Sequence, residues 1–215
     1  MKRGKPLTRE ESRARTRELV LEAAEEVFLA NGFLATTVAQ IAANAARTTG
    51  SIYSHFPSKE ALCQALLERH YGRLFAEASE LLARSGDDLE AKIEMLTQQW
   101  RILTANDAYT TLVVEYAVAV RRDPEQYAQL TAFWELLRGM IRAVIADASG
   151  LGTSKAEIAA VDAAFNGIVS SAIGLAAAQT ATMMDAETAA TSLAETARIW
   201  MNRLQPTEPT DALGG

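Results

Sequence analysis

The sequence has few of the residues from which several common sites are built. Its single cysteine, Cys63, excludes an internal disulfide, and with only His55 and His70 as histidines a Cys/His metal cluster is excluded too. No apolar run reaches the roughly 18 residues that a membrane helix needs. The charged start MKRGKPLTREESRAR is unlike a signal peptide. We therefore expect a soluble cytoplasmic protein with no cofactor, no metal and no membrane partner.

Catalytic motifs are also missing. The sequence contains no nucleophile elbow, no HExxH, no Walker loop and no ExxH pair for a di-iron bundle, and Glu68 and His70 have the wrong spacing for the last of these. With two histidines there is little material for general acid–base chemistry. We expect that the protein is not an enzyme.

Charge is distributed unevenly along the 215 residues, whose net charge is −6. Residues 1–17 hold seven basic and two acidic side chains, whereas residues 61–215 hold twelve basic and twenty acidic ones. A small basic head on an acidic body suits a local anionic partner. A basic terminus that only aids solubility is the alternative.

Proline is scarce, and the apolar residues recur with helical periodicity. Capping residues and breakers predict an all-α protein of about nine helices. The predicted helices begin at about Thr16, Thr37, Thr48, Ser58, Asp87, Asp107, Asp123, Ser154 and Asp185, and end at about Asn31, Ala45, His55, Arg84, Leu103, Arg121, Ser149, Thr182 and Gln205. The tail 205–215 is predicted to be disordered.

Residues 37–56 have the spacing of a helix-turn-helix, with two short helices joined by a tight turn. The second helix, TTGSIYSH, is too polar for a core helix, and only Ile52 has an inward character. Hydroxyl groups and a ring nitrogen suit the base edges and phosphates of a DNA major groove. Gly50 permits close approach of the backbone. The alternatives are that Tyr53 and Phe56 are core aromatics and that His55 is a surface cap.

The stretch 16–62 resembles the DNA-binding domain of TetR-type transcriptional regulators. The residues that carry the resemblance are VFLANGF (27–33), TTVAQIA (36–42) and TGSIYSHFPSKEAL (49–62). The resemblance implies an N-terminal three-helix DNA-binding domain (1–57) and a C-terminal helical domain for effector binding and dimerisation (58–204). It also implies a DNA operator, a small-molecule effector and a homodimer as partners.

The resemblance further implies which residues contact DNA. Phosphate or groove-edge contacts are implied for Thr37 and Gln40, base contacts for Thr49, Gly50 and Ser51, and phosphate contacts for Tyr53, His55 and Lys59. Thr48 and Arg47 complete the predicted interface, with Arg47 either pointing towards DNA or covering the turn with its stem. The basic residues before position 18 could reach a flanking groove or form an ordinary solvated face.

Two departures from the family pattern affect the turn and the base-reading helix. Ala46-Arg47 stands where the family usually has glycine and an aliphatic residue, and Thr49 stands where a basic residue is common. Alanine in a left-handed turn position is strained by roughly 1 kcal/mol or more.

Two further sets of residues are predicted in the second domain. Aromatic and polar side chains on helices five to eight are candidates to line an effector cavity, although a solid core is the alternative for each: Trp100, Tyr109, Tyr116, Phe133, Trp134, Phe165 and Asn166. Glu115 either meets a cationic ligand or belongs to a solvated face. Small and apolar residues on helices eight and nine are candidates for a dimer interface, unless they pack within one subunit: Gly167, Ser171, Gly174, Leu193, Ala197 and Trp200.

These observations predict a ligand-responsive, sequence-specific DNA-binding regulator, with a repressor released from a palindromic operator by a small, apolar or aromatic effector as the favoured form. The alternative is a helical ligand-binding or carrier protein of the same fold that no longer binds DNA.

Overall fold

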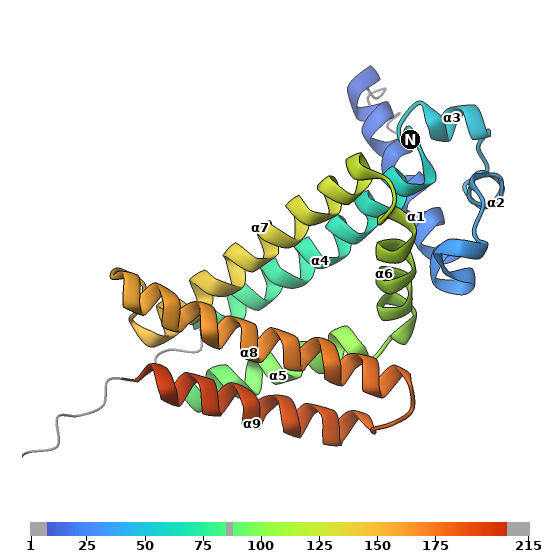
Figure 1. The fold of residues 1–215 in the computed structure, drawn as a ribbon. Coiled ribbons are helices and arrows are strands. Elements are labelled where there is room, and N and C mark those ends of the chain that lie inside the picture. The colour runs from blue at the N-terminus through green and yellow to red at the C-terminus, as the bar shows by residue number, and fades with distance from the viewer. Residues whose placement is uncertain (1–7, 85–87, 206–215) are drawn as a thin grey trace, which may run out of the picture. The chain divides into compact units, whose positions relative to one another are not determined.

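The computed structural model describes residues 8–84 and 88–205 of the chain. Within these ranges the regular structure consists of nine α-helices and no strand (Figure 1). The helices are α1 (Arg9–Ala35), α2 (Val38–Asn44), α3 (Thr49–Tyr53), α4 (Lys59–Arg84), α5 (Leu89–Thr104), α6 (Asp107–Val120), α7 (Pro124–Ser149), α8 (Lys155–Thr180) and α9 (Ala186–Leu204). The all-α prediction is confirmed. Of the predicted disordered tail, only Gln205 lies inside the described residues.

Several helix starts are fixed by the local capping that the sequence predicts. Thr37 and Gln40 form a capping box at α2, and Ser154 and Glu157 form another at α8. Asp185 caps α9 through the Thr188 amide. Each cap satisfies amide groups that have no partner inside the helix, so these starts depend on residues only three positions apart.

Two predicted starts are wrong. The first helix begins at Arg9 rather than Thr16, because Thr8 accepts from the Glu11 amide (3.2 Å) while Glu11 Oε2 accepts from the Thr8 amide (2.6 Å). These first turns are solvent-exposed and carry no apolar stripe. The fifth helix is capped by Asp88, whose Oδ1 accepts from the Glu90 amide at 3.0 Å; the predicted cap Asp87 lies outside the described residues.

The chain forms two compact units, which cross the predicted domain boundary. Unit 1 comprises residues 1–73 and 107–133, and unit 2 comprises residues 74–106 and 134–215, each taken over its described part. These units are defined by how the chain packs, whereas the predicted boundary separates a DNA-binding part from an effector-binding part. The division between residues 57 and 58 therefore stays a prediction.

The core of unit 1 forms where α1 packs against α2 and α6. Phe28, Ile41, Leu62 and Tyr116 are completely buried in it. Cys63 is buried there too, as a small core residue, and burial raises the pKa of its thiol. The Tyr116 hydroxyl donates to Gln64 Oε1 at 2.9 Å. The one polar atom of this buried side chain therefore has a hydrogen-bond partner inside the core.

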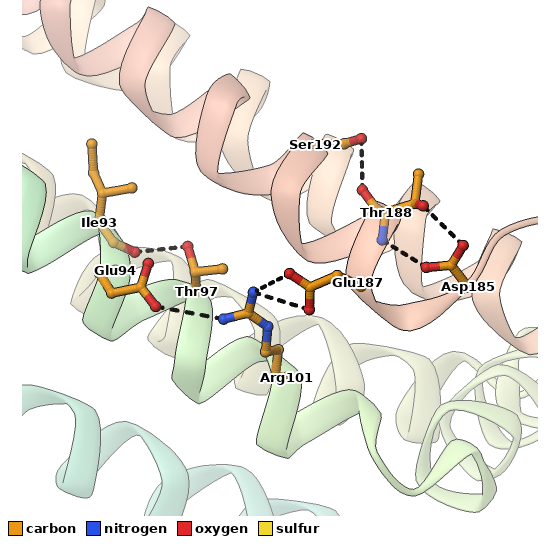
Figure 2. A network of polar contacts seen from close by, with 8 residues as sticks. All are labelled: Ile93, Glu94, Thr97, Arg101, Asp185, Glu187, Thr188 and Ser192. Carbon is orange, nitrogen blue, oxygen red and sulfur yellow. Dashed lines mark hydrogen bonds and ion pairs between the residues drawn. The ribbon is translucent and has the colours of Figure 1, made fainter.

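In unit 2, α9 packs against both α5 and α8 (Figure 1). Ala189, Ala190 and Leu193 of α9 are buried against Trp100 of α5. Figure 2 shows the polar edge of this contact, where Arg101 of α5 pairs with Glu187 at the start of α9 (3.2 Å) and with Glu94 one to two turns earlier on its own helix (3.6 Å). The pairing joins the two helices at the end where α9 begins.

Helix α8 is more apolar than we expected, since the sequence analysis found no apolar run long enough for a membrane helix. By length and composition it could cross a membrane, and it alone among the helices in the described parts of the chain meets that criterion. Only 17% of its most apolar window is buried. Ile173 is 67% exposed, and a Cβ at Gly174 would have nothing within 4 Å. Within one chain, α8 therefore has an apolar surface with no cover.

Glu115 of α6 is half-buried and makes a contact that neither of its two predicted roles included. Its Oε2 accepts from the Leu34 amide at 3.1 Å, beside Gly32, whose φ of 76° breaks the regular geometry of α1. A Cβ at position 32 would lie 2.6 Å from the same oxygen. Glu115 thus replaces the acceptor that the amide loses where the helix is interrupted, and it joins α1 to α6.

We expect Glu115→Ala to lower the free energy of unfolding by about 1 kcal/mol, because the Leu34 amide loses a charged acceptor. Thr111→Ala removes an exposed side chain one turn earlier on the same helix, and we expect it to change stability by less than about 0.5 kcal/mol. Urea denaturation of both variants measures the difference. Equal effects of the two would contradict the role given to Glu115.

A second polar cluster joins α1, α4 and α6. Arg69 of α4 pairs with Glu18 and Glu25 of α1, and Tyr109 of α6 donates to Glu25. The His70 ring stacks on Tyr109, with centroids 3.6 Å apart and planes 11° from parallel. Burial lowers the pKa of His70 to about 4, helped by the charges of Arg73 and Arg69 and opposed by Glu25.

This shift predicts a pH dependence of stability. The unfolded chain protonates His70 near pH 6.5, whereas the folded chain does so only near pH 4, so acidification through this window favours unfolding. We expect His70→Phe, which keeps the stacking, to lose less stability than wild type between pH 7 and pH 5. Urea midpoints at the two pH values measure this, and an equal loss in both proteins would refute the assignment.

A candidate nucleic-acid interface

Helices α2 and α3 are joined by a turn that takes the strained conformation expected from the sequence. Ala46 has a φ of 51°, in the left-handed region. The Arg47 amide donates to the Ala42 carbonyl (2.9 Å) and the Ala46 amide to that of Ala43 (3.2 Å), which is the hydrogen-bond pattern of a Schellman motif. The cost of an alanine here is roughly 1–2 kcal/mol. The motif closes α2 and sets the direction in which α3 leaves.

The inner side of this motif is apolar. Ile52 is the buried residue of α3, and it packs in the same cluster as Ile41 and Ala42 of α2. Phe56, just beyond α3, is 3% exposed. The alternative that Phe56 is a core aromatic is confirmed. Helix α3 is therefore attached to its unit through Ile52, and through Phe56 just after the helix.

The outer side of α3 is polar and accessible. Thr49 and Gly50 are exposed, Ser51 is half-buried and Tyr53 is 53% exposed. A Cβ at Gly50 would meet only Thr48 Oγ1, at 3.9 Å, so nothing inside the protein requires glycine there. Thr48 is occupied as the N-cap, accepting from the Ser51 amide at 3.1 Å. Thr49, Gly50 and Tyr53 therefore offer a contact surface to an external partner.

The predicted contacts at the start of α2 are partly occupied. Gln40 Oε1 accepts from both the amide (2.7 Å) and the hydroxyl (2.9 Å) of Thr37. Both residues are exposed, and the amide nitrogen of Gln40 is the donor that this pair offers to a ligand. The Arg47 guanidinium folds back on its own turn, with Nη1 donating to the Ala46 carbonyl at 3.1 Å.

His55 lies half-buried just after α3, and its amide donates to the Ile52 carbonyl. Burial lowers the pKa of His55, and the charges of Arg13 and Arg17 lower it further. The Arg17 guanidinium stands over the Phe56 ring, 5.0 Å from its centroid. The first helix thus supplies positive charge to the corner that follows α3.

Lys59 is half-buried, and its ammonium group contacts the protein itself, while the predicted phosphate contact stays a prediction. Its Nζ donates to the carbonyls of Phe33 (2.8 Å) and Thr36 (2.9 Å) and lies 4.2 Å from the centroid of the Phe33 ring. At most one of its three N–H groups remains for an external anion. The lysine ties the start of α4 to the junction of α1 and α2, a role that the sequence did not reveal.

The seven predicted cavity residues are divided between the two units, and their role in effector binding stays a prediction. Tyr109, Tyr116 and Phe133 belong to unit 1, whereas Trp100, Trp134, Phe165 and Asn166 belong to unit 2. Tyr116 and Phe165 are buried in separate cores, and Asn166 is exposed. Sequence reasoning had no means to distinguish aromatic side chains that pack together from those that surround a space.

Two hollows in unit 2 are lined by other residues. One, of about 400 Å³, is bordered by Ser79, Lys92, Met140, Ala143, Val144, Asp147 and Ala148. The second, of about 550 Å³, adjoins the turn between α8 and α9 and is bordered by Gln179, Thr182, Met183, Met184, Asp185, Ala186 and Thr188. Among the described residues no group of three His, Cys, Asp or Glu side chains is placed to hold a metal ion.

Several of the predicted dimer residues are already used within the chain. A Cβ at Gly167 would lie 2.1 Å from the Trp200 indole, so this glycine lets α9 approach α8 in the same subunit. Leu193 and Ala197 are buried in unit 2. Ser171 Oγ donates to the Gly167 carbonyl (2.8 Å), and Gly174 faces open space.

Two short helices, a tight turn and an exposed polar second helix are the arrangement of a helix-turn-helix DNA-binding protein. Residues 20–66 match the model for "Bacterial regulatory proteins, tetR family". The transcriptional repressor KstR2 of Rhodococcus jostii is 33% identical over 134 residues, which span 60% of this chain and 65% of that protein. The transcriptional activator FasR of Mycolicibacterium smegmatis is 26% identical, covering 100% of this chain and 83% of its own.

Solved structures agree with the fold. SCO4454, a TetR-family regulator from Streptomyces coelicolor, superposes with a TM-score of 0.66 at 17% identity, covering 90% of this chain and 97% of its own. Thermus thermophilus FadR, a TetR-family repressor in complex with lauroyl-CoA, superposes with a TM-score of 0.60 at 22% identity. The superposition covers 93% of this chain and 100% of FadR. The chain belongs to the TetR family of transcriptional regulators. These regulators are not enzymes, in agreement with the missing catalytic motifs.

Proposed function

We propose that this protein is a sequence-specific DNA-binding repressor of the cytoplasm, released from a palindromic operator by a small, largely apolar effector. The observation that carries the proposal is the outer side of α3. Thr49, Gly50 and Tyr53 are accessible there, while Ile52 holds the helix from the opposite side. KstR2, the 33% identical relative, is named a repressor.

The chemistry of this surface suits reading in the major groove. The Thr49 hydroxyl both donates and accepts, so it can meet base edges, and Gly50 allows the helix backbone to come close. The Tyr53 hydroxyl and the Gln40 amide are suited to phosphate oxygens, which fix position rather than sequence. Lys59 contributes by holding the helices in place.

A dimer would be formed by α8. Its apolar surface around Ile173 and Gly174 is uncovered within one chain and lies on a helix of 26 residues. Pairing with a second copy would bury this surface and generate two-fold symmetry. Two recognition helices related in this way fit half-sites about 34–36 Å apart in a palindromic operator.

The effector is proposed to bind the 400 Å³ hollow of unit 2. Met140, Ala143 and Val144 give it an apolar wall. Lys92 and Asp147 add one charge of each sign, which would orient a polar end of the ligand. The FadR proteins of Bacillus subtilis and Thermus thermophilus, which share the fold, were solved with stearoyl-CoA and lauroyl-CoA.

We expect the protein to bind duplex DNA flanking its own gene more tightly than a scrambled duplex, measured by fluorescence anisotropy at two salt concentrations. Tyr53→Ala should weaken this binding about tenfold, because it removes one contact worth roughly 1–3 kcal/mol. Tyr127→Ala is the matched control, since Tyr127 is also an exposed tyrosine (50%, against 53% for Tyr53) but lies on α7.

Equal losses in the two tyrosine variants would remove α3 from the interface. Absence of binding to any duplex would favour the alternative of a ligand carrier. The same assay tests the effector, with lauroyl-CoA and stearoyl-CoA as first probes. Release by a probe in wild type but not in Val144→Trp, which fills the hollow, would support the proposed site.

We expect the protein to be a dimer by light scattering and Ile173→Glu to shift it towards monomer, because a buried carboxylate at the α8 surface is costly. Met183→Glu is the control. Met183 is 81% exposed and lies in the turn after α8, so its charge should leave the dimer intact. A monomeric wild type, or dissociation by both variants, would contradict the assignment of the interface.

A further inference from the structure

The first three turns of α1 carry arginines at regular helical spacing. Arg9, Arg13 and Arg17 are four residues apart, so successive side chains are rotated by only ~40° and rise by ~6 Å along the helix. Arg15 points to roughly the opposite side of the same helix. All four are exposed, and all precede the stretch 20–66 that matches the family model.

The segment that carries these arginines is a rigid helix rather than a loose arm. The capping box of Thr8 and Glu11 starts α1 immediately before Arg9, and the helix continues without interruption as far as Gly32. A side chain on such a helix loses less freedom on binding than one on a disordered arm. The arginines are therefore presented in a fixed row.

The row leads to the end of the recognition helix. Arg17 stands over the Phe56 ring, and Phe56 follows His55 directly. The charges of Arg13 and Arg17 both depress the pKa of His55, so their field reaches this corner. Within the described residues none of Arg9, Arg13 and Arg17 forms an ion pair, although Glu10 and Glu11 lie nearby in the sequence. Their charge is available to an external anion.

We propose that Arg9, Arg13 and Arg17 form a phosphate-binding ridge, which engages the DNA backbone beside the base pairs that α3 reads. The inference rests on the proposed function and adds a second contact surface to it. Arg17, already stacked on Phe56, sets the end of the ridge nearest α3, whereas Arg13 and Arg9 extend it outward by one turn each. Such contacts give affinity and position without sequence preference.

The test compares single-charge variants on opposite sides of α1. We expect Arg13→Gln to lower the slope of log Kobs against log salt by about 0.9, the value for one phosphate contact, and to weaken operator and scrambled DNA by the same factor. Arg15→Gln removes the same charge from the other side and should leave the slope unchanged. The double variant Arg9→Gln/Arg13→Gln should lower the slope by about 1.8.

A second measurement varies the DNA. Removing about half a helical turn (~5 base pairs) from each end of the duplex should weaken binding of wild type and of Arg15→Gln, but affect the double variant much less. Thermal unfolding of all variants checks that the exposed substitutions leave the fold intact.

The outcomes separate the two proposals. If wild type binds no duplex, the proposed function fails and the ridge fails with it. If wild type prefers its operator but Arg13→Gln and Arg15→Gln have the same slope, or the double variant responds to trimmed flanks as wild type does, the ridge is refuted while the regulator stands.

Discussion

The placement of the recognition helix depends on the Lys59 ammonium group. Helix α3 has five residues and one buried side chain, Ile52, so it cannot hold a fixed orientation by its own packing. Lys59 donates to the carbonyls of Phe33 and Thr36 and lies against the Phe33 ring, which ties the start of α4 to the junction that leads into α2. Hydrogen bonds to a charged group contribute roughly 1.5–3 kcal/mol each. The short α3 is thereby held between two anchored helices.

The local parts of the fold were predictable from the sequence, and the long-range polar contacts were not. The caps at Thr37, Ser154 and Asp185 and the left-handed Ala46 depend on neighbours within a few residues, so the sequence pattern contains their cause. The bond from Leu34 to Glu115 joins residues 81 positions apart, and Lys59 reaches back 23 and 26 positions. Such pairs exist only once the helices have packed.

The candidate DNA surface and the candidate effector site differed in how well sequence reasoning identified them. On α3 the polar residues and the single apolar Ile52 separate an outer side from an inner one, and the structure has that arrangement. In the body of the chain, aromatic residues such as Tyr116 and Phe165 suit both a core and a cavity, and both are buried in cores. The hollow in unit 2 is bordered instead by Met140, small aliphatic residues and the polar side chains of Ser79, Lys92 and Asp147, a mixture that does not stand out in the sequence.

Selection of binding sites from a random duplex library tests the central claim most directly, because it requires no assumption about the operator. If α3 reads bases as one of a symmetric pair, the full-length protein will enrich a palindrome whose half-sites are centred one helical turn, or a multiple of it, apart. Retention of duplexes without any common sequence, or of none at all, would contradict the account.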